Sequence, residues 1–256
     1  MAKALDWVMD NTMPGQVMLQ SWLTQQGVDR KTSWHYLNKG WFTRLDHGVY
    51  YRTGKTPDWV DAVQCLQKQW NTPVHVAGLT SLTQQGQSHY LEITKPQIWL
   101  SIPQRTYLLS WLKRIDNVTW TQIISRPMPS NAENYLINLN LDGRAIVASS
   151  LELAAYEVVS HIPKHITISH ADELFQGLNR LSPKKMKSLL SVSTNVKTNR
   201  ILLYLAHRNG HQWVKFIDEA EIELGTGARQ VVEGGKLDPQ YKITVPNDFM
   251  DEKSYG

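Results

Sequence analysis

One stretch, residues 15–52, constrains the fold of this chain more than any other: GQVMLQSWLTQQGVDRKTSWHYLNKGWFTRLDHGVYYR. It predicts a helix, a tight turn, a second helix and a short β-hairpin in immediate succession. The first helix would gather its apolar side chains on one face, those of Val17, Leu19, Trp22 and Leu23. Gly27 is expected to end it, because glycine adopts the left-handed conformation that reverses a chain after a helix. This succession is the layout of a winged helix-turn-helix.

The second predicted helix begins after Asp29, whose carboxylate can accept hydrogen bonds from the free N–H groups of the first turn, and ends at Gly40. Its inward side chains are predicted to be Val28, Thr32, Tyr36 and Leu37. Its outer face is predicted to carry Arg30, Lys31, Ser33, Trp34, His35, Asn38 and Lys39. The turn Asp46-His47-Gly48 between two runs rich in aromatic and β-branched residues predicts the wing.

The charge of this region favours an anionic partner. Between residues 29 and 55 there are six basic residues and two acidic ones, an excess of four positive charges. Such a surface gains from displacing counterions on DNA, and Ser and Asn beside Arg and Lys can donate to base edges. The candidate DNA-binding residues are Arg30, Lys31, Ser33, Trp34, Asn38, Lys39, Arg44, His47 and Arg52. The alternative is a solvated basic face on a helical module that binds protein.

Length and composition set the class of protein. The 256 residues suffice for two or three compact units, and 41% hydrophobic residues with ten tryptophans indicate folded domains. A single cysteine, Cys65, excludes an intramolecular disulfide and a cysteine-based zinc cluster within one chain, so we expect a cytoplasmic protein. The N-terminal segment lacks the apolar core of a signal peptide, and no apolar run is long enough to predict a membrane span.

The remainder predicts an α+β fold, with the winged helix-turn-helix followed by a larger mixed α/β region. A helix capped by Asp58 is expected as far as Trp70, then a strand at VHVAG and a short helix that ends in a loop at LTSLTQQGQSHYL. Strands are predicted at IWLSI, VTWTQIIS, YLINLNLDG and AIVAS, and helices at LELAAYEVVSHI, ADELFQGLNRL and SPKKMKSLLSV. The predicted divisions are a DNA-binding domain over 1–55, a mixed α/β middle region over 56–148, and a helical then β-hairpin C-terminal region over 149–256.

A second basic stretch lies between residues 180 and 215, which contains eight basic residues and no acidic one. It offers a surface to flanking DNA, an RNA or an acidic protein, or it is simply a set of exposed helix faces. Its main members are Arg180, Lys184, Lys185, Lys187, Lys197, Arg200 and Arg208.

Catalysis is the less favoured alternative. Asp218, Glu219, Glu221 and Glu223 precede Lys236, a set of residue types found in metal-dependent nucleases, but their spacing fits ordinary strand edges better. No phosphate-binding glycine loop, HExxH or GxSxG motif is present. A metal site formed by Cys65, His75 and His89 is less expected than burial of these side chains. We therefore expect no enzyme, no metal and no cofactor; a winged-helix regulator that senses a small ligand remains a further alternative.

Several segments in order resemble one known family. GWFTRLDHGVYYR, PVHVAGLTSLTQQGQSHYL, TNRILLYLAHRNGHQWVKF and ELGTGARQVVEGGKLDPQYKITVP make the chain similar to AbiEi-type antitoxins from about residue 5 to residue 246. The resemblance implies an antitoxin and transcriptional repressor of a type IV toxin–antitoxin system, some of which act in phage defence. It implies that the N-terminal domain represses the protein's own operon and that the C-terminal region neutralises a co-encoded nucleotidyltransferase-like toxin.

The partners implied are operator DNA, as an inverted repeat upstream of the operon, and the toxin, without a stable complex being required. The basic residues from Arg180 to Arg208 are the candidate antitoxic surface. Because a single winged domain binds weakly, we expect two copies, a monomer or weak dimer in solution that binds DNA cooperatively. Trp34 and His35 lie at positions expected to vary with the operator, so the resemblance does not specify the operator sequence.

Overall fold

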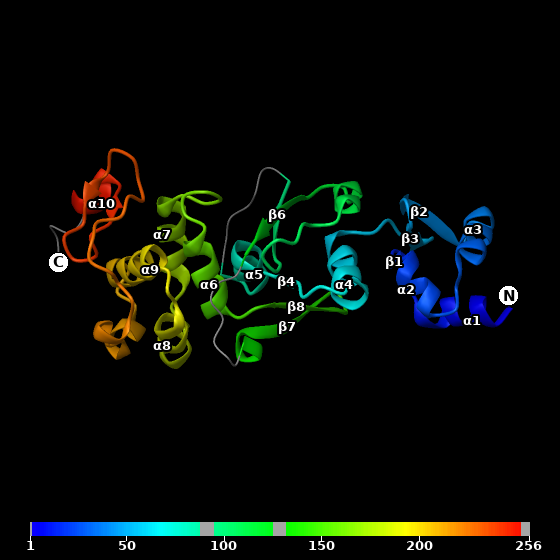
Figure 1. Cartoon of the computed structure of the whole chain (residues 1–256), viewed down its shortest axis with the longest axis horizontal. Coiled ribbons are helices and arrows are strands. Elements are labelled where there is room, and N and C mark those ends of the chain that lie inside the picture. Colours follow the sequence, from blue (N-terminus) through cyan, green and yellow to red (C-terminus); the bar gives the residue numbers. More distant parts are fainter. Residues whose placement is uncertain (1, 88–94, 125–131, 252–256) are drawn as a thin grey trace. The chain divides into compact units, whose positions relative to one another are not determined.

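A computed structural model describes residues 2–87, 95–124 and 132–251 (Figure 1). The described chain falls into two compact units. The first comprises Met1–Val76, Glu92–Ile124 and Asn138–Ala148, and the second comprises Ala77–Leu91, Ser125–Ile137 and Ser149–Gly256. The chain is an α+β protein whose N-terminal winged helix-turn-helix is followed by a larger mixed α/β region.

The winged helix-turn-helix opens the first unit. Its elements are α1 (Ala2–Asn11), β1 (Val17–Leu19), α2 (Gln20–Gln25), α3 (Arg30–Asn38), β2 (Phe42–Asp46) and β3 (Val49–Arg52). The three strands form an antiparallel sheet in the order β1-β3-β2. The local signals act as predicted, because Gly27 and Gly40 both have positive φ and the Asp29 carboxylate accepts a 2.7 Å hydrogen bond from the Thr32 N–H.

The start of the first predicted helix was wrong. Val17 and Leu19 belong to β1, which pairs Met18 with Tyr50 of β3, and helix α2 begins only at Gln20. All three residues of β1 are buried, so a strand that pairs with the hairpin both satisfies their backbone groups and keeps every side chain from water. The hydrophobic core of the winged helix-turn-helix consists of Val8, Met18, Leu23, Val28, Tyr36, Phe42 and Tyr50. The N-terminal segment forms α1, which contributes Val8 to this core.

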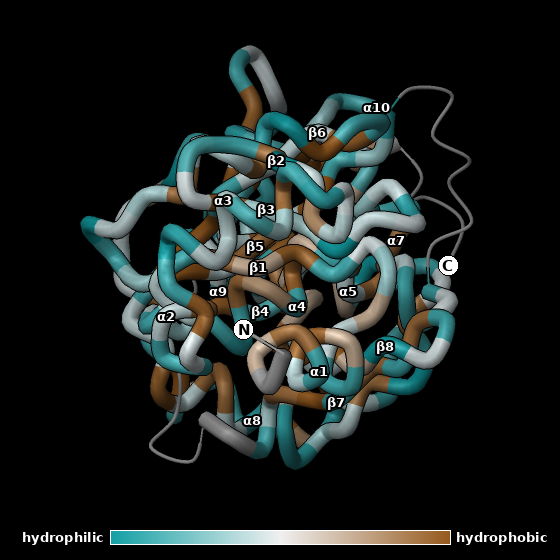
Figure 2. Tube along the Cα trace, turned by 90° about the vertical axis from the view of Figure 1, so that its right-hand side faces the viewer, coloured by the Kyte–Doolittle hydropathy of each residue, from teal (hydrophilic) through white to brown (hydrophobic). Residues whose placement is uncertain are grey.

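A long helix and a five-stranded sheet complete the first unit. The helix is α4 (Trp59–Gln69), and the strands are β4 (His75–Val76), β5 (Gln97–Ser101), β6 (Thr119–Ile123), β7 (Leu136–Leu141) and β8 (Arg144–Ser149), with η1 (Ser110–Arg114) between β5 and β6. The sheet order is β6-β5-β4-β8-β7; β5 runs parallel to β6 and antiparallel to β4, and β4 runs parallel to β8. Trp99 is fully buried in β5. In Figure 2, brown hydrophobic stretches alternate with white and teal ones along the tube, including at β7. The predicted strands are confirmed here.

The second unit is mainly helical. Its elements are α5 (Gly78–Gln84), η2 (Ala132–Tyr135), α6 (Leu151–Ser160), α7 (Ile168–Gly177), α8 (Pro183–Val192), α9 (Val196–Arg208), η3 (Gln212–Phe216), η4 (Glu219–Glu221), β9 (Lys236–Leu237), β10 (Thr244–Val245) and α10 (Asn247–Asp251). Helix α9 is buried along most of its length and packs against α6 and α7. The predicted C-terminal strands shrink to the antiparallel pair β9 and β10.

Buried polar pairs join the helices of this unit. The Glu157 carboxylate in α6 is fully buried and accepts hydrogen bonds from the N–H of Gly78 and the hydroxyl of Ser149.

Within the described ranges, no helix is both long and apolar enough to cross a bilayer. The division of the chain at residues 55 and 148 stays a prediction.

Candidate nucleic-acid interface

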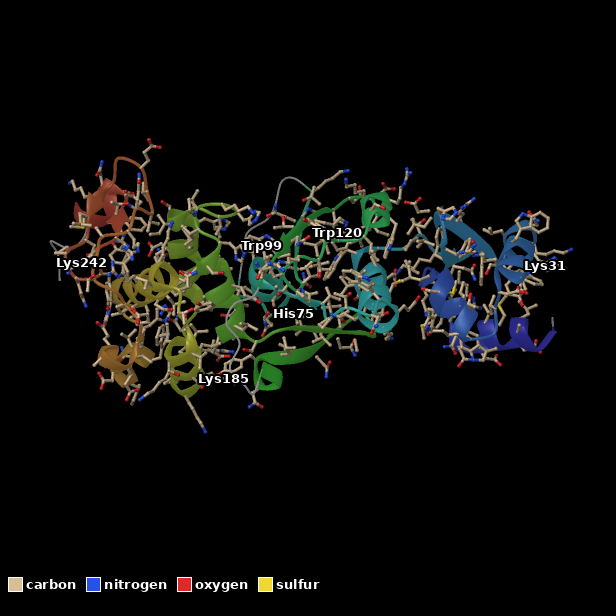
Figure 3. The ribbon with its side chains drawn as sticks, in the orientation of Figure 1. Lys31, His75, Trp99, Trp120, Lys185 and Lys242 are labelled. Atoms are coloured by element: carbon tan, nitrogen blue, oxygen red, sulfur yellow. The ribbon has the colours of Figure 1, made fainter. Side chains whose placement is uncertain are left out.

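The outer face of α3 exposes basic and polar side chains together with one tryptophan. Arg30, Lys31, Trp34 and Asn38 are exposed along it, and Lys39 follows at its C-terminal end. Arg30, Trp34 and Asn38 are four residues apart in turn, so they line one side of the helix. The indole of Trp34 is 66% exposed. Figure 3 shows Lys31 projecting away from the ribbon.

The start of α3 has a fixed geometry. Hydrogen bonding by the side chain and backbone of Thr32 lowers the pKa of the Asp29 carboxyl, which therefore stays ionised as the helix cap at neutral pH. This cap fixes the residue at which α3 begins. Tyr36 packs edge-on against Phe42 of β2, which ties the helix to the wing.

The expected outer position of Ser33 was wrong. Its side chain is fully buried and shares the inward face with Tyr36, three residues later, whereas Thr32 is half-buried. Ser33 therefore takes the inward position predicted for Thr32, whereas Val28 and Tyr36 are buried as predicted. Ser33 is thus not available to donate to a base edge. The half-buried His35 lies edge-on against Trp41, with ring centroids 6.2 Å apart.

Two of the three wing residues that were predicted to contact DNA are exposed to solvent. Arg44 and His47 are exposed, and the His47 N–H donates a 2.8 Å hydrogen bond to the Asp46 carboxylate, which shapes the turn. Gly48 completes that turn with a φ of 69°, a conformation that L side chains rarely adopt.

Arg52 was predicted to contact the DNA backbone from the wing, and its contacts in the structure disagree with that role. Its guanidinium donates to the carbonyl oxygens of Met9, at 2.9 Å, and Thr12. A cation at this end of α1 stabilises the carbonyls that have no partner within the helix. Arg52 therefore holds α1 against the hairpin and does not project from the wing.

The basic residues from 180 to 208 do not form one continuous surface. Arg180 and Lys184 are exposed, Lys185 lies 3.8 Å from Glu152, and Lys187 pairs with Glu221 at 2.8 Å. Lys197 is half-buried, and that burial lowers its pKa. Two further members are held by contacts within the fold.

These two are Arg200 and Arg208; the predicted surface position of Arg200 was wrong, and Arg208 is half-buried. Arg200 is 2% exposed and donates to the carbonyl oxygens of residues 224, 225, 227 and 242. Arg208 pairs with Asp172 at 3.2 Å and covers the ring of Phe249 at 4.1 Å. Both lie on α9, whose sequence contains no acidic residue. The local sequence therefore did not indicate that these two arginines have partners within the fold.

The acidic residues before Lys236 are each engaged separately. Asp218 caps η4, Glu219 accepts a 2.6 Å hydrogen bond from the Tyr241 hydroxyl, and Glu223 accepts one from the Gly225 N–H. Glu221 pairs with Lys187. Among the described residues, no group of three or more His, Cys, Asp or Glu is placed to hold a metal ion. The arrangement gives no support to a nuclease centre.

Of the three residues in the metal alternative, the structure describes Cys65 and His75. Cys65 is buried, and burial raises the pKa of its thiol. His75 is buried in β4. His89 lies outside the described residues.

Sequence reasoning overlooked one residue beside the wing. Arg114, the last residue of η1, lies with its Nε 3.8 Å from the Asp46 carboxylate. The adjacent Lys113 and Arg114 after the apolar pair Trp111-Leu112 were the local signal, but the local sequence does not indicate that η1 meets β2.

Comparison with known structures supports the fold. The crystal structure of the RV2827C protein from Mycobacterium tuberculosis superimposes with a TM-score of 0.59 over 94% of this chain and 89% of that one, at 16% identity. At that identity the likeness concerns the fold alone. No curated protein matches the sequence.

Family profiles match both parts of the chain. Residues 1–93 match a profile described as the N-terminal domain of the AbiEi antitoxin transcriptional regulator. Residues 95–246 match a profile described as a transcriptional regulator, AbiEi antitoxin, of a type IV toxin–antitoxin system. The chain therefore belongs to the AbiEi family of antitoxins, transcriptional regulators of type IV toxin–antitoxin systems.

Proposed function

We propose that this protein represses its own operon by binding an inverted repeat in the promoter through α3 and the wing. The observation that carries the proposal is the exposed row Arg30, Trp34 and Asn38 on α3, with Lys31 and Lys39 beside it. Arginine offers two donors to the O6 and N7 acceptors of guanine, and asparagine offers one donor and one acceptor to the N7 and N6 amino group of adenine in the major groove. The lysines and the wing residues Arg44 and His47 supply phosphate contacts, which set the position of the helix on the duplex.

Trp34 has a specific place in this proposal. A large exposed indole on a helix that enters the major groove finds one apolar partner there, the C5-methyl group of thymine. We therefore assign Trp34 to contact a thymine in each half-site. Two copies of the chain on an inverted repeat supply the affinity that one winged domain lacks.

The proposal has a second part, neutralisation of a co-encoded nucleotidyltransferase-like toxin by the C-terminal region. Family membership supports this role. After the loss of Arg200 and Arg208 to structural roles, the candidate residues are Arg180, Lys184, Lys185, Lys187 and Lys197. A type IV antitoxin opposes the toxin without a stable complex being required.

DNA binding is tested by fluorescence-anisotropy titration of the full chain against the DNA upstream of its gene, with a scrambled duplex as control, between about 50 and about 200 mM salt. We expect saturable binding that prefers the operator and weakens steeply with salt. The double variant Arg30→Ala/Lys31→Ala should lose operator binding. The double variant Lys68→Ala/Lys164→Ala removes the same charge at exposed positions that belong neither to α3 nor to the wing, and it should bind as wild type. Equal, weak binding of both duplexes would contradict the proposal.

A further inference from the structure

Two segments far apart in the sequence meet at the wing. Asp46 ends β2 at the wing turn, and Arg114 ends η1. The Asp46 Oδ2 and the Arg114 Nε are 3.8 Å apart, and η1 packs against β2. The turn that carries the wing residue His47 therefore has a basic neighbour from outside the winged helix-turn-helix.

The segment η1 is anchored by its apolar half. Trp111 and Leu112 are buried, and the Leu112 carbonyl accepts a 2.8 Å hydrogen bond from the indole N–H of Trp120 in β6. Trp120 is labelled in Figure 3. The basic half, Lys113 and Arg114, is exposed. The fold thus presents two cations from a fixed backbone.

The ion pair alone does not explain why Arg114 is placed there. Its side chain is 66% exposed and that of Asp46 is 31% exposed, so the pair is open to solvent. Pairs of this kind contribute about 0 to 1 kcal/mol to stability. The guanidinium is therefore free to make a further contact on its exposed side.

DNA phosphates supply that contact. An Asp46 carboxylate at the wing turn would repel the backbone that the wing approaches, and Arg114 offsets this charge. Phosphates follow one another every ~3.4 Å of helix axis along each strand. A duplex that touches His47 therefore carries further phosphates alongside η1.

We propose that the DNA interface continues beyond the winged helix-turn-helix onto η1, where Lys113 and Arg114 bind the phosphate backbone that flanks the wing contact. The proposal rests on the proposed function, because it extends the same operator complex. It adds a contact from the middle of the chain, outside the segment 15–52 that marks the DNA-binding motif.

The first test is the salt dependence of operator binding by the full-length Lys113→Ala/Arg114→Ala variant. Each lost phosphate contact should make the slope of log Kobs against log salt less steep by about 0.9, so we expect a change of about 1.8. Affinity for operator and scrambled duplex should fall by the same factor, because phosphate contacts do not read sequence. Lys113→Arg/Arg114→Lys keeps both positive charges and should have the wild-type slope. Lys68→Ala/Lys164→Ala should also have the wild-type slope.

A second test locates the contact on the DNA. Neutral methylphosphonate linkages are placed singly through the flanks of each half-site. For wild type we expect the largest losses at the wing contact and at the neighbouring phosphates. The Lys113→Ala/Arg114→Ala variant should be insensitive to the second group and as sensitive as wild type to the first.

The outcomes separate the two proposals. If the wild type does not select the operator, the proposed function and this extension are both contradicted. If the wild type selects the operator, and Lys113→Ala/Arg114→Ala has the same salt slope and the same methylphosphonate pattern as wild type, only the extension is contradicted. Circular dichroism of each variant checks that the fold is retained.

Discussion

Arg200 illustrates how one side chain holds a region that has little regular structure. Its Nε donates to the Leu224 carbonyl at 2.6 Å, and its two terminal nitrogens donate to the carbonyls of Gly227 and Gly225 at 2.6 and 3.0 Å. Burial, and then the nearby positive charge of Arg229, lowers its pKa. The guanidinium takes the place of a β-ladder for a loop whose own strands are only two residues long.

We expect Arg200→Met to destabilise the second unit strongly. The apolar replacement removes the hydrogen bonds that the buried guanidinium donates to these carbonyls, and a hydrogen bond to a charged group contributes about 1.5–3 kcal/mol. Urea denaturation should show a lower midpoint, whereas Lys184→Ala at an exposed position should change stability by no more than about 0.5 kcal/mol. Equal midpoints for Arg200→Met and wild type would show that the carbonyls find other partners.

Trp34 leads to a prediction about recognition. Trp34→Ala should leave the free energy of unfolding unchanged, because the indole is exposed, and should weaken operator binding about tenfold or more. Replacing one thymine of each half-site by deoxyuracil removes the methyl group. Wild type should lose affinity at that position and Trp34→Ala should not. A wild-type protein insensitive at every thymine would contradict the assignment.

At the scale of elements, the start of α4 joins three parts of the first unit. Asp58 and Asp61 form a capping box, Lys55 lies 3.2 Å from both carboxylates, and the Arg144 guanidinium of β8 lies 2.5 Å and 2.9 Å from them. Gln69, at the other end of α4, accepts from the Leu19 N–H at 2.8 Å and donates to the Val17 carbonyl at 2.9 Å. Helix α4 thus binds β1 at one end and the five-stranded sheet at the other.

The capping box predicts a pH dependence. Burial raises the pKa of Asp58, but hydrogen bonds from Arg144 and from the Asp61 backbone outweigh it and lower the pKa from 3.8 to about 2. Because the folded-state pKa is the lower one, the carboxylate stabilises the fold above about pH 4, and this contribution is lost as the pH falls towards 2.

Denaturation of wild type and Asp58→Asn across this range checks the prediction. The difference in stability should be largest at neutral pH and should shrink between about pH 4 and about pH 2. Asp142→Asn is the matched control, since Asp142 lies 3.6 Å from the same Arg144 but is 92% exposed. A difference that does not change with pH would contradict the shifted pKa.

At the scale of the molecule, repression and neutralisation are expected to be separable by point variants. Deleting residues 1–55 tests this less cleanly, because it also removes Lys55 from the Asp61 carboxylate and β1 from Gln69. In the full chain, Arg30→Ala/Lys31→Ala should derepress a promoter reporter and still protect cells that express the toxin. Arg180→Ala/Lys184→Ala should do the reverse. If either variant loses both activities while remaining folded, the two functions are not separable.

Elements whose signals are local could be predicted from the amino-acid sequence. Asp29 and Asp58 each accept hydrogen bonds from backbone N–H groups a few residues away, and Gly27 and Gly48 supply the turns, so α3, the wing and α4 were predictable. A cap or a turn is decided by atoms within a few residues. The family resemblance, spread over several segments, was equally legible.

Which residues are available to a partner depends on how distant segments of the chain pack together. β1 is a strand because β3 pairs with it, and Ser33, Arg52, Arg200 and Arg208 are withdrawn from the proposed surfaces by groups distant in sequence. The contact of Arg114 with the wing has the same origin. Charge is a property of a residue, whereas exposure depends on what the rest of the chain packs against it, and the spacing of a basic residue along the sequence does not encode that.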